Sequence, residues 1–164
     1  RALTLLRAGD LPGAAAAVAE AEAVRPRTPG EAVSADGATT RRFDDLRDAD
    51  DLFAPVLEVL TTAGEYMWVP FERLESLEFE APRRPRDLYW RRTMLNLKDG
   101  TEGLVFIPAI YPWTEADTPT PLKLGRETDW SGPEGGPVRG LGQRLLLAGE
   151  DALPLAEAGT LRFG

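Results

Sequence analysis

The sequence has 164 residues, of which 43% are hydrophobic, so it is long enough for one domain with a core of its own. It carries 27 acidic and 19 basic side chains, a formal net charge of −8. This acidic balance disfavours nucleic acids and anionic membrane surfaces, which attract basic proteins. Cysteine and histidine are absent, which excludes disulfides, thiolate zinc sites, cysteine nucleophiles and histidine bases. No apolar run reaches the roughly 18 residues of a membrane-spanning helix.

Residues 1–26 have the pattern of two short helices. "RALTLLRAG" is followed by a Gly-Asp turn and by "AAAAVAEAEAV", rich in the strongest helix former. The spacing of small residues and proline matches the second half of a tetratricopeptide repeat: Gly9, Asp10, Ala14, Ala21 and Pro26. An ordinary alanine-rich helical hairpin is the alternative. Because one such repeat cannot bury its apolar face alone, the repeat interpretation predicts further helices before the first residue.

The rest of the chain is predicted to be a linker followed by strands. Residues 27–42 are dense in proline, glycine, threonine and alanine and lack periodicity, which is typical of a linker. Residues 43–164 contain apolar runs separated by short turns. We expect β-hairpins at three of these turns: Ala63-Gly64, Asp99-Gly100 and Gly149 to Asp151.

The predicted fold class is therefore α+β. A tetratricopeptide-like helical remnant, residues 1–26, is joined by the linker to a mostly antiparallel β domain, residues 43–164. About eight strands of this domain are expected to curl into a half-open barrel.

Two segments of the predicted β domain have an expected orientation. "WVPFERLESLEFE" ends one strand, turns at Pro70-Phe71 and continues as a strand with Leu77 and Phe79 toward the core. Residues 104–107 are apolar on both faces, which is typical of a central strand.

The acidic stretch "DDLRDADD" has two interpretations. Its aspartates are Asp44, Asp45, Asp48, Asp50 and Asp51. Carboxylates bind hard cations such as calcium or magnesium, but the spacing of an EF-hand is not met. Aspartates also cap helix N-termini or form a solvated acidic face, and this second interpretation is the stronger one. The sequence therefore predicts no metal ligands.

The sequence shows no nucleophile with its base and no phosphate-binding loop. Without histidine a serine would need a lysine as base, and neither Lys98 nor Lys123 has Ser-x-x-Lys spacing. The glycine-rich residues 132–142 lack the Gly-Lys-Ser/Thr ending of a phosphate loop. Paired carboxylates of the glycosidase kind stay open, because their separation in space cannot be read from sequence. We predict no catalytic residue and no cofactor.

Aromatic side chains are the remaining candidates for a binding site. Most aromatic residues of a small β domain belong to its core, but tryptophan and tyrosine are also enriched at protein interfaces. Trp113 is the best candidate because it follows a proline at a strand end and precedes a polar run. The residues predicted to contact a partner are Trp68, Phe71, Trp90 and Trp113.

Several uncommon strings of the C-terminal part occur together in one family. In chain order they are "RDADDLFAPVLEVL", "WVPFERLESLEFE", "PRDLYW", "GLVFIPAIYPWTEAD", "LKLGRETDW" and "GLGQRLLLAGED". Through them, residues 43–163 resemble the ImpE family, also called SciE-type or TagJ accessory proteins of bacterial type VI secretion.

The resemblance implies a non-enzymatic, virulence-associated protein of the cytoplasm that has no cofactor. It implies a tetratricopeptide-like helical region followed by a mostly β domain. The implied partners are the small subunit of the contractile sheath and the AAA+ ATPase that disassembles contracted sheath. The alternative from another class is a small ligand-binding or hydrolytic domain that uses the clustered carboxylates and an aromatic pocket.

Overall fold

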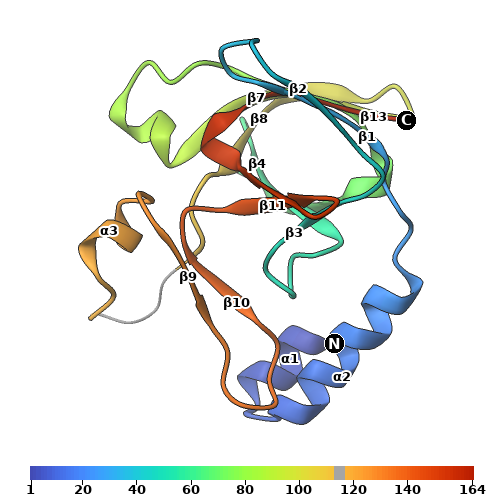
Figure 1. Cartoon of the computed structure of the whole chain (residues 1–164), viewed down its shortest axis with the longest axis vertical. Coiled ribbons are helices and arrows are strands. Elements are labelled where there is room, and N and C mark those ends of the chain that lie inside the picture. Colours follow the sequence, from blue (N-terminus) through green and yellow to red (C-terminus); the bar gives the residue numbers. More distant parts are fainter. Residues whose placement is uncertain (113–116) are drawn as a thin grey trace.

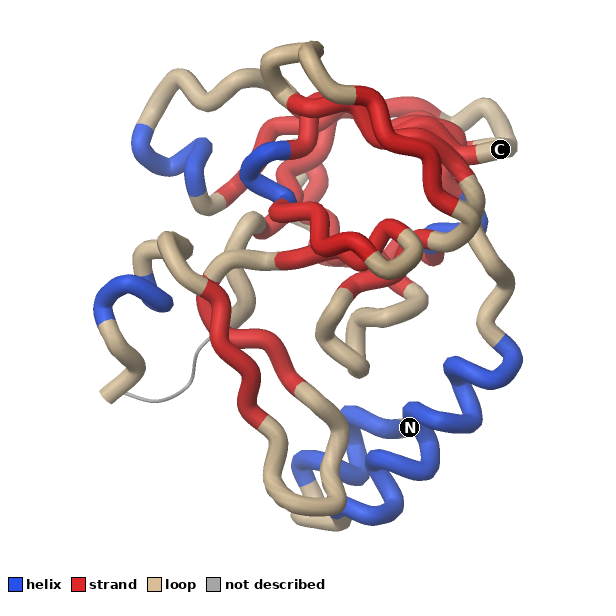
Figure 2. Tube along the Cα trace, viewed as in Figure 1, coloured by secondary structure: helices blue, strands red, loops and turns tan. Residues whose placement is uncertain are grey.

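The computed structural model describes residues 1–112 and 117–164 (Figure 1). Helices α1 (Ala2–Arg7) and α2 (Leu11–Val24) lie on one side of a body made of strands (Figures 1 and 2). The strands in chain order are β1 (Gly30–Ser34), β2 (Thr40–Phe43), β3 (Leu46–Asp48), β4 (Val56–Thr61), β5 (Tyr66–Pro70), β6 (Leu74–Phe79), β7 (Trp90–Leu97), β8 (Glu102–Pro108), β9 (Thr128–Ser131), β10 (Arg139–Gly142), β11 (Leu145–Ala148), β12 (Asp151–Pro154) and β13 (Ala158–Phe163). The shorter helical segments are η1 (Phe71–Arg73), η2 (Pro85–Leu88), α3 (Thr120–Lys123) and η3 (Leu155–Glu157).

The strands of the described residues form antiparallel sheets. The largest has the order β2-β1-β13-β6-β7-β8-β4-β5, and two smaller ones have the orders β12-β11-β3 and β10-β9. The edge strands β2 and β5 of the largest sheet do not pair with each other within the described chain, so this sheet is open. One apolar core joins residues of the two larger sheets, and its fully buried members include Leu46, Leu57, Leu77, Ile107, Leu146 and Leu161.

The predicted α+β fold with a tetratricopeptide-like remnant is wrong. The described chain is mostly antiparallel β, with one short helical region before the strands, and its sheets are open rather than a half-open barrel. Helices α1 and α2 form a single hairpin, and no tetratricopeptide-like repeat is present among the described residues.

The sequence pattern of that hairpin has local causes. Gly9 has a φ of 79°, which favours glycine, and the Asp10 side chain accepts a hydrogen bond of 2.9 Å from the Gly13 N–H. Ala14 is fully buried, whereas Ala21 is exposed. Because any helical hairpin needs a turn, a cap and a close crossing, this spacing does not identify a repeat.

Residues 27–42, predicted as a linker, take part in the largest sheet. Strand β1 pairs with β2 on one side and with β13 on the other. Only Ala32 of β1 is buried, so this strand has no apolar alternation that the sequence could reveal.

The three predicted hairpins are confirmed. They join β4 to β5, β7 to β8, and β11 to β12. Gly100 has a φ of 85° at the β7–β8 turn, as an Asp-Gly hairpin requires. Strand β8 lies between β7 and β4, which confirms the predicted central strand.

Two segments far apart in the sequence repeat one structure. In the first unit, residues 56–79, the β4–β5 hairpin leads through Pro70 and η1 into β6. In the second unit, residues 145–163, the β11–β12 hairpin leads through Pro154 and η3 into β13. Each hairpin begins with a residue that pairs with its proline: Val56 with Pro70, and Leu145 with Pro154.

The two units meet in the largest sheet around an approximate two-fold axis. Their last strands, β6 and β13, are antiparallel, and Leu77 pairs with Leu161. Both leucines stand seven residues after the proline of their unit, so the axis passes through this pair. The β7–β8 hairpin beside β6 corresponds to the β1–β2 hairpin beside β13.

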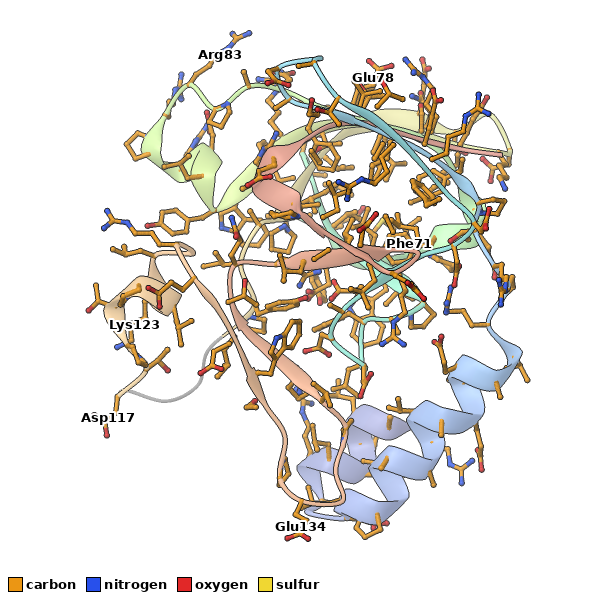
Figure 3. The ribbon with its side chains drawn as sticks, in the orientation of Figure 1. Phe71, Glu78, Arg83, Asp117, Lys123 and Glu134 are labelled. Atoms are coloured by element: carbon orange, nitrogen blue, oxygen red, sulfur yellow. The ribbon has the colours of Figure 1, made fainter. Side chains whose placement is uncertain are left out.

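The first residue of each 3-10 turn fills the core. Phe71 is 1% exposed and Leu155 is 0% exposed. Each backbone N–H donates to the carbonyl just before its hairpin, Phe71 to Pro55 at 3.1 Å and Leu155 to Arg144 at 3.0 Å. Figure 3 shows Phe71 pointing inward, whereas Glu78 of β6 lies on the outer surface.

The predicted inward orientation of Leu77 and Phe79 is confirmed, since both are buried. A register shift between Leu74 and Ser76 turns Leu74 inward as well, although strict alternation would place it on the outer face.

Candidate binding pocket

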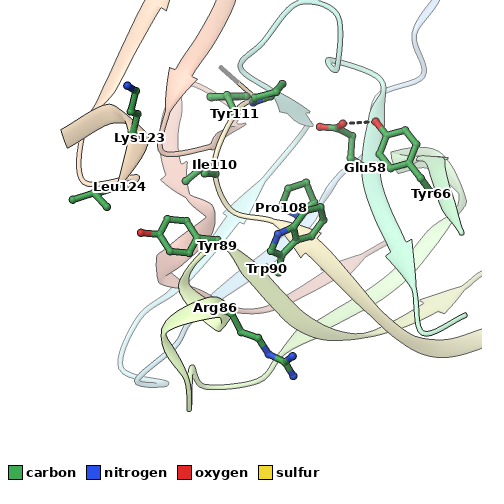
Figure 4. A pocket seen from close by; sticks show the side chains of 11 residues that line it. Glu58, Tyr66, Arg86, Tyr89, Trp90, Pro108, Ile110, Tyr111, Lys123 and Leu124 are labelled. Atoms are coloured by element: carbon green, nitrogen blue, oxygen red, sulfur yellow. Dashed lines mark hydrogen bonds between the residues drawn. The ribbon is translucent and has the colours of Figure 1, made fainter. Parts of the chain in front are cut away.

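A mostly apolar pocket of 680 Å³ opens beside the ends of β7 and β8 (Figure 4). This volume lies in the range of small-molecule and cofactor sites, roughly 300–1,000 Å³. Its walls are mainly aromatic and aliphatic: Tyr89, Trp90, Pro108, Ile110, Tyr111, Pro112 and Leu124. Its polar lining residues are Glu58, Tyr66, Arg86 and Lys123.

Prolines end the strand pairing at this place. Trp90 begins β7 and pairs with Pro108, the last residue of β8. Proline cannot donate a ladder hydrogen bond. Beyond Pro108 a single backbone hydrogen bond between the two segments is found in the described residues, from the Ala109 N–H to the Tyr89 carbonyl at 2.8 Å. The aromatic side chains near the strand ends therefore line an opening instead of continuing a packed sheet.

Glu58 and Tyr66 form the polar end of the pocket. The Tyr66 hydroxyl donates to the Glu58 carboxylate (Figure 4). The same carboxylate also accepts from the Arg144 guanidinium. The Trp68 indole donates to the Tyr66 hydroxyl oxygen at 2.6 Å. Burial and the bond to Glu58 raise the pKa of Tyr66 to about 12. The polar end is thus bonded within the protein, and the aromatic and aliphatic part of the wall offers apolar contacts.

Four of the five clustered aspartates are engaged by arginines and backbone N–H groups. Asp45 accepts from Arg25 at 2.9 Å, and Asp51 accepts from Arg47 at 2.9 Å. The fully buried Asp50 accepts from Arg139 Nε at 2.8 Å and from the Gly140 N–H at 2.9 Å.

Neither interpretation made from the sequence, cation ligands on the one hand or helix caps or a solvated face on the other, fits these four aspartates. They cap no α-helix, and each is paired with an arginine. Asp48 and Asp50 are buried against Arg144 and Arg139 from distant parts of the chain. Asp45 and Asp51 are partly exposed and pair with Arg25, which follows α2, and with the nearby Arg47. Asp44 is exposed. In the described ranges, no group of three or more acidic side chains is placed to hold a metal ion.

Asp48 belongs to a buried ionic cluster with Arg144 and Glu58. It accepts from the Tyr111 hydroxyl at 2.7 Å, and Arg144 Nη1 lies 3.3 Å from its other oxygen. Burial raises the pKa of Asp48 to about 6, although Arg144 and Tyr111 oppose the shift. Burial would lower the pKa of Arg144, but the two carboxylates outweigh it and raise that pKa.

The geometry of this buried ionic cluster is not that of a hydrolytic site. Asp48 and Glu58 come near each other, as paired catalytic carboxylates would, but the guanidinium of Arg144 stands between them. Asp48 is fully buried, and both oxygens of Glu58 already accept hydrogen bonds. The arrangement is suited to holding strands together and not to transferring protons to a ligand.

Of the four residues predicted to contact a partner, the three that the structure describes lie in different surroundings. Trp90 is 40% exposed and lines the pocket, and Trp68 is 43% exposed beside its polar end. Phe71 is a core residue, because the turn after Pro70 directs it inward, and the prediction for it is not supported. Trp113 lies outside the described residues.

Sequence reasoning missed most of the pocket wall. Ile110, Leu124 and the prolines of the wall were not singled out, nor was the pairing of Glu58 with Tyr66. A signal was present in "PRDLYW" and "IPAIYP", where prolines interrupt apolar runs and so open a strand ladder.

Fold and site together define an antiparallel β domain with an aromatic-lined binding pocket. The model of one family, described as ImpE protein, matches residues 40–162, and the chain belongs to the ImpE family. This is an accessory family associated with type VI secretion and is not a known enzyme class.

A solved structure agrees with this assignment. The crystal structure of protein VPA1032 from Vibrio parahaemolyticus is similar, with a TM-score of 0.77 and 30% sequence identity. The match covers 90% of this chain and 52% of that one, so the chain spans about half of that protein's length. None of the curated proteins matches. Among the helices of the described residues, none has both the length and the hydropathy needed to cross a membrane.

Proposed function

We propose that this protein is a non-enzymatic adaptor of the type VI secretion system that binds the small subunit of the contractile sheath. In this proposal it acts in the cytoplasm, needs no cofactor, and helps to bring sheath to the AAA+ ATPase that disassembles it. Membership of the ImpE family supports the link to type VI secretion.

The aromatic-lined pocket is the observation that carries the binding role. Tyr89 and Trp90 line an opening of 680 Å³ with exposed apolar side chains in its wall, Trp90 at 40% and Leu124 at 38% exposure. Tryptophan, tyrosine and arginine are the residues that most often dominate protein interfaces. The carboxylates of Asp48 and Glu58 near the pocket are paired inside the fold, which fits a docking site better than a catalytic one.

The test is a calorimetric titration of the small sheath subunit into this chain. We expect saturable binding that Trp90→Ala weakens about tenfold or more, as interface anchors do. Met94→Ala is the matched control, because Met94 is on the same strand and also 40% exposed but does not line the pocket. No binding of the subunit to the wild-type chain would overturn the proposal.

A small-ligand-binding domain is the second candidate, favoured by the volume and apolar lining of the same pocket. It predicts a rise of Tm with small apolar ligands in a thermal-shift screen, together with no affinity for the sheath subunit. Hydrolysis is not part of this candidate, because Arg144 holds the nearby carboxylates.

A further inference from the structure

Arginines gather beside the pocket although the whole chain is acidic. Residues 83–92, "RRPRDLYWRR", run from the connection after β6 through η2 into the start of β7 and include Trp90. Their exposed arginines are Arg83, Arg84, Arg86 and Arg92. In a protein with a net charge of −8, this segment is a local basic surface next to an apolar opening.

Two smaller hollows continue the pocket toward these arginines. A hollow of 210 Å³ shares Trp90 and Arg86 with the pocket and is also lined by Leu60 and Phe106. A third, of 120 Å³, shares Arg86 and Phe106 with the second and adds Arg83, Arg84 and Arg92 to its walls. Since Arg86 lines all three, we call this continuous surface the Arg86 strip.

Much of the positive charge of the Arg86 strip is not neutralised by the protein. One oxygen of Asp87 accepts the backbone N–H groups of Arg83 and Arg84, each at 3.0 Å. Arg86 lies 3.6 Å from the other oxygen of Asp87, and Arg92 pairs with Glu80 at 3.1 Å. Within the described residues, the guanidinium groups of Arg83 and Arg84 have no carboxylate within 4.0 Å. Figure 3 shows Arg83 extending away from the ribbon.

We infer that the Arg86 strip docks a segment of the sheath subunit in which apolar side chains stand next to aspartate or glutamate. An apolar side chain fills the pocket against Tyr89 and Trp90, and adjacent carboxylates pair with Arg83, Arg84 and Arg86. This inference rests on the proposed adaptor function and adds the chemistry of the segment that is bound.

Charge complementarity is the reason for choosing this occupant. A guanidinium pairs with a carboxylate through two parallel hydrogen bonds, which fixes orientation as well as affinity. A basic segment would place like charges together, and a purely apolar one would leave the arginines without partners. The aromatic walls provide apolar contact area, and the arginines select an acidic neighbour and speed the encounter.

The first test is charge reversal. The small sheath subunit is titrated against the wild-type chain and against the double variant Arg83→Glu/Arg84→Glu. We expect binding to weaken at least about tenfold, because paired charges become repelling ones. The matched control is Arg41→Glu/Arg42→Glu on β2, which makes the same charge change at two exposed arginines that line none of the three hollows.

The second test does not use the sheath subunit. The probes are 8-anilinonaphthalene-1-sulfonate, an apolar anion, and N-phenyl-1-naphthylamine, its uncharged analogue, in fluorescence titrations. We expect the anion to bind several-fold more tightly, Arg86→Glu to remove this preference, and Trp90→Ala to weaken both dyes. Equal affinity for the two dyes in the wild-type chain would overturn the inference. Circular dichroism melts of each variant show that it is folded.

The outcomes separate this inference from the adaptor function. If the subunit binds the wild-type chain and the charge-reversed variant equally, the Arg86 strip is not the docking site, but the adaptor function stands. If the subunit does not bind the wild-type chain, the adaptor function fails. If in that case the anionic dye still binds more tightly than the uncharged one, the occupant of the Arg86 strip is a free apolar anion. The inference that the strip docks a protein segment would then be overturned.

Discussion

The first and second units have the same backbone arrangement but different roles in the protein. Both run from a hairpin through a proline and a 3-10 turn into a central strand. The second unit is associated with two buried guanidinium groups. Arg144 stands just before β11, where the first unit has Pro55, and Arg91 caps the carbonyls of η3. The first unit instead contributes exposed Tyr66 and Trp68, and its Glu58 reaches the pocket.

The two arginines show two ways of burying a charge. Carboxylates flank Arg144 and raise its pKa, whereas Arg91 donates only to carbonyl oxygens. The acceptors for Arg91 include Leu155 and Ala156, both at 2.8 Å, and burial lowers the pKa of this arginine. The same backbone arrangement therefore has two roles: the second unit is anchored by buried arginines, and the first unit faces the binding pocket.

Removing the guanidinium of Arg144 should destabilise the protein more than any other substitution that we propose. Arg144→Met leaves Asp48 and Glu58 buried without their shared cation, and breaking a buried pair in this way costs about 3–5 kcal/mol. Urea unfolding measures the loss, with Arg162→Met, an exposed arginine, as the control. A loss below about 1 kcal/mol would show that the cluster does not stabilise the fold.

Truncating the buried residue of each 3-10 turn tests whether the two turns contribute equally to the core. We expect Phe71→Ala to lower the free energy of unfolding by about 4 kcal/mol and Leu155→Ala by about 3 kcal/mol, in proportion to the volume removed. Urea melts of both variants decide whether the two turns are equivalent. A small loss at either position would mean that the turn is not a core element of its unit.

The pH dependence of stability tests the carboxylate side of the cluster. The pKa of Asp48 is raised from 3.8 to about 6, so the folded state binds its proton more tightly than the unfolded state does. The stabilisation that comes from this tighter proton binding is fully present below about pH 4 and is lost as the pH rises through about 6. At 1.36 kcal/mol per pKa unit the loss is about 3 kcal/mol.

Asp48→Asn removes this titration and leaves the other groups in place. The free energy of unfolding of the wild type, minus that of the variant, should therefore fall between pH 4 and pH 7. Parallel pH profiles for the two proteins would contradict the assignment to Asp48.

The smallest expected effect is at Arg91. Arg91→Met removes the donors to three carbonyl groups around η3 but leaves no carboxylate unpaired, so we expect a loss of about 2 kcal/mol. The neighbouring Arg92→Met is the control, because Arg92 is exposed and should change stability by less than about 0.5 kcal/mol. A loss at Arg91 as large as that at Arg144 would erase the distinction between the two arginines.

Hairpins were predictable from sequence, but the sheet that they build was not. Asp99-Gly100 between apolar runs specifies a turn through local backbone preferences, and that turn is present. The place of β1 beside β13 depends on hydrogen bonds between residues far apart in the chain, and the single buried Ala32 gives no pattern to read. The helical repeat was overpredicted, because Gly9, Asp10 and Ala14 satisfy the needs of one hairpin alone.

The candidate site was predictable only in part. Trp90 stood out as an aromatic residue, but which aromatics face an opening depends on where strand pairing stops. The aspartates were interpreted as helix caps or a solvated face because only their neighbours in sequence could be considered, whereas Arg139 and Arg144, the partners of Asp50 and Asp48, lie some ninety residues further on. Neither their pairing nor the burial of Asp48 is visible in the sequence.

The position of β13 has a consequence for how the protein is made. This strand follows the other described strands in the chain, yet it lies inside the largest sheet and joins β2-β1 to β6-β7-β8-β4-β5. A ribosome releases the chain from the N-terminal side, at roughly 5–20 residues per second. The β1–β2 hairpin therefore waits with the edge of β1 unpaired while residues 44–157 are made, and the nascent chain is open to unwanted pairing until residues 158–163 emerge and join the two parts of the sheet.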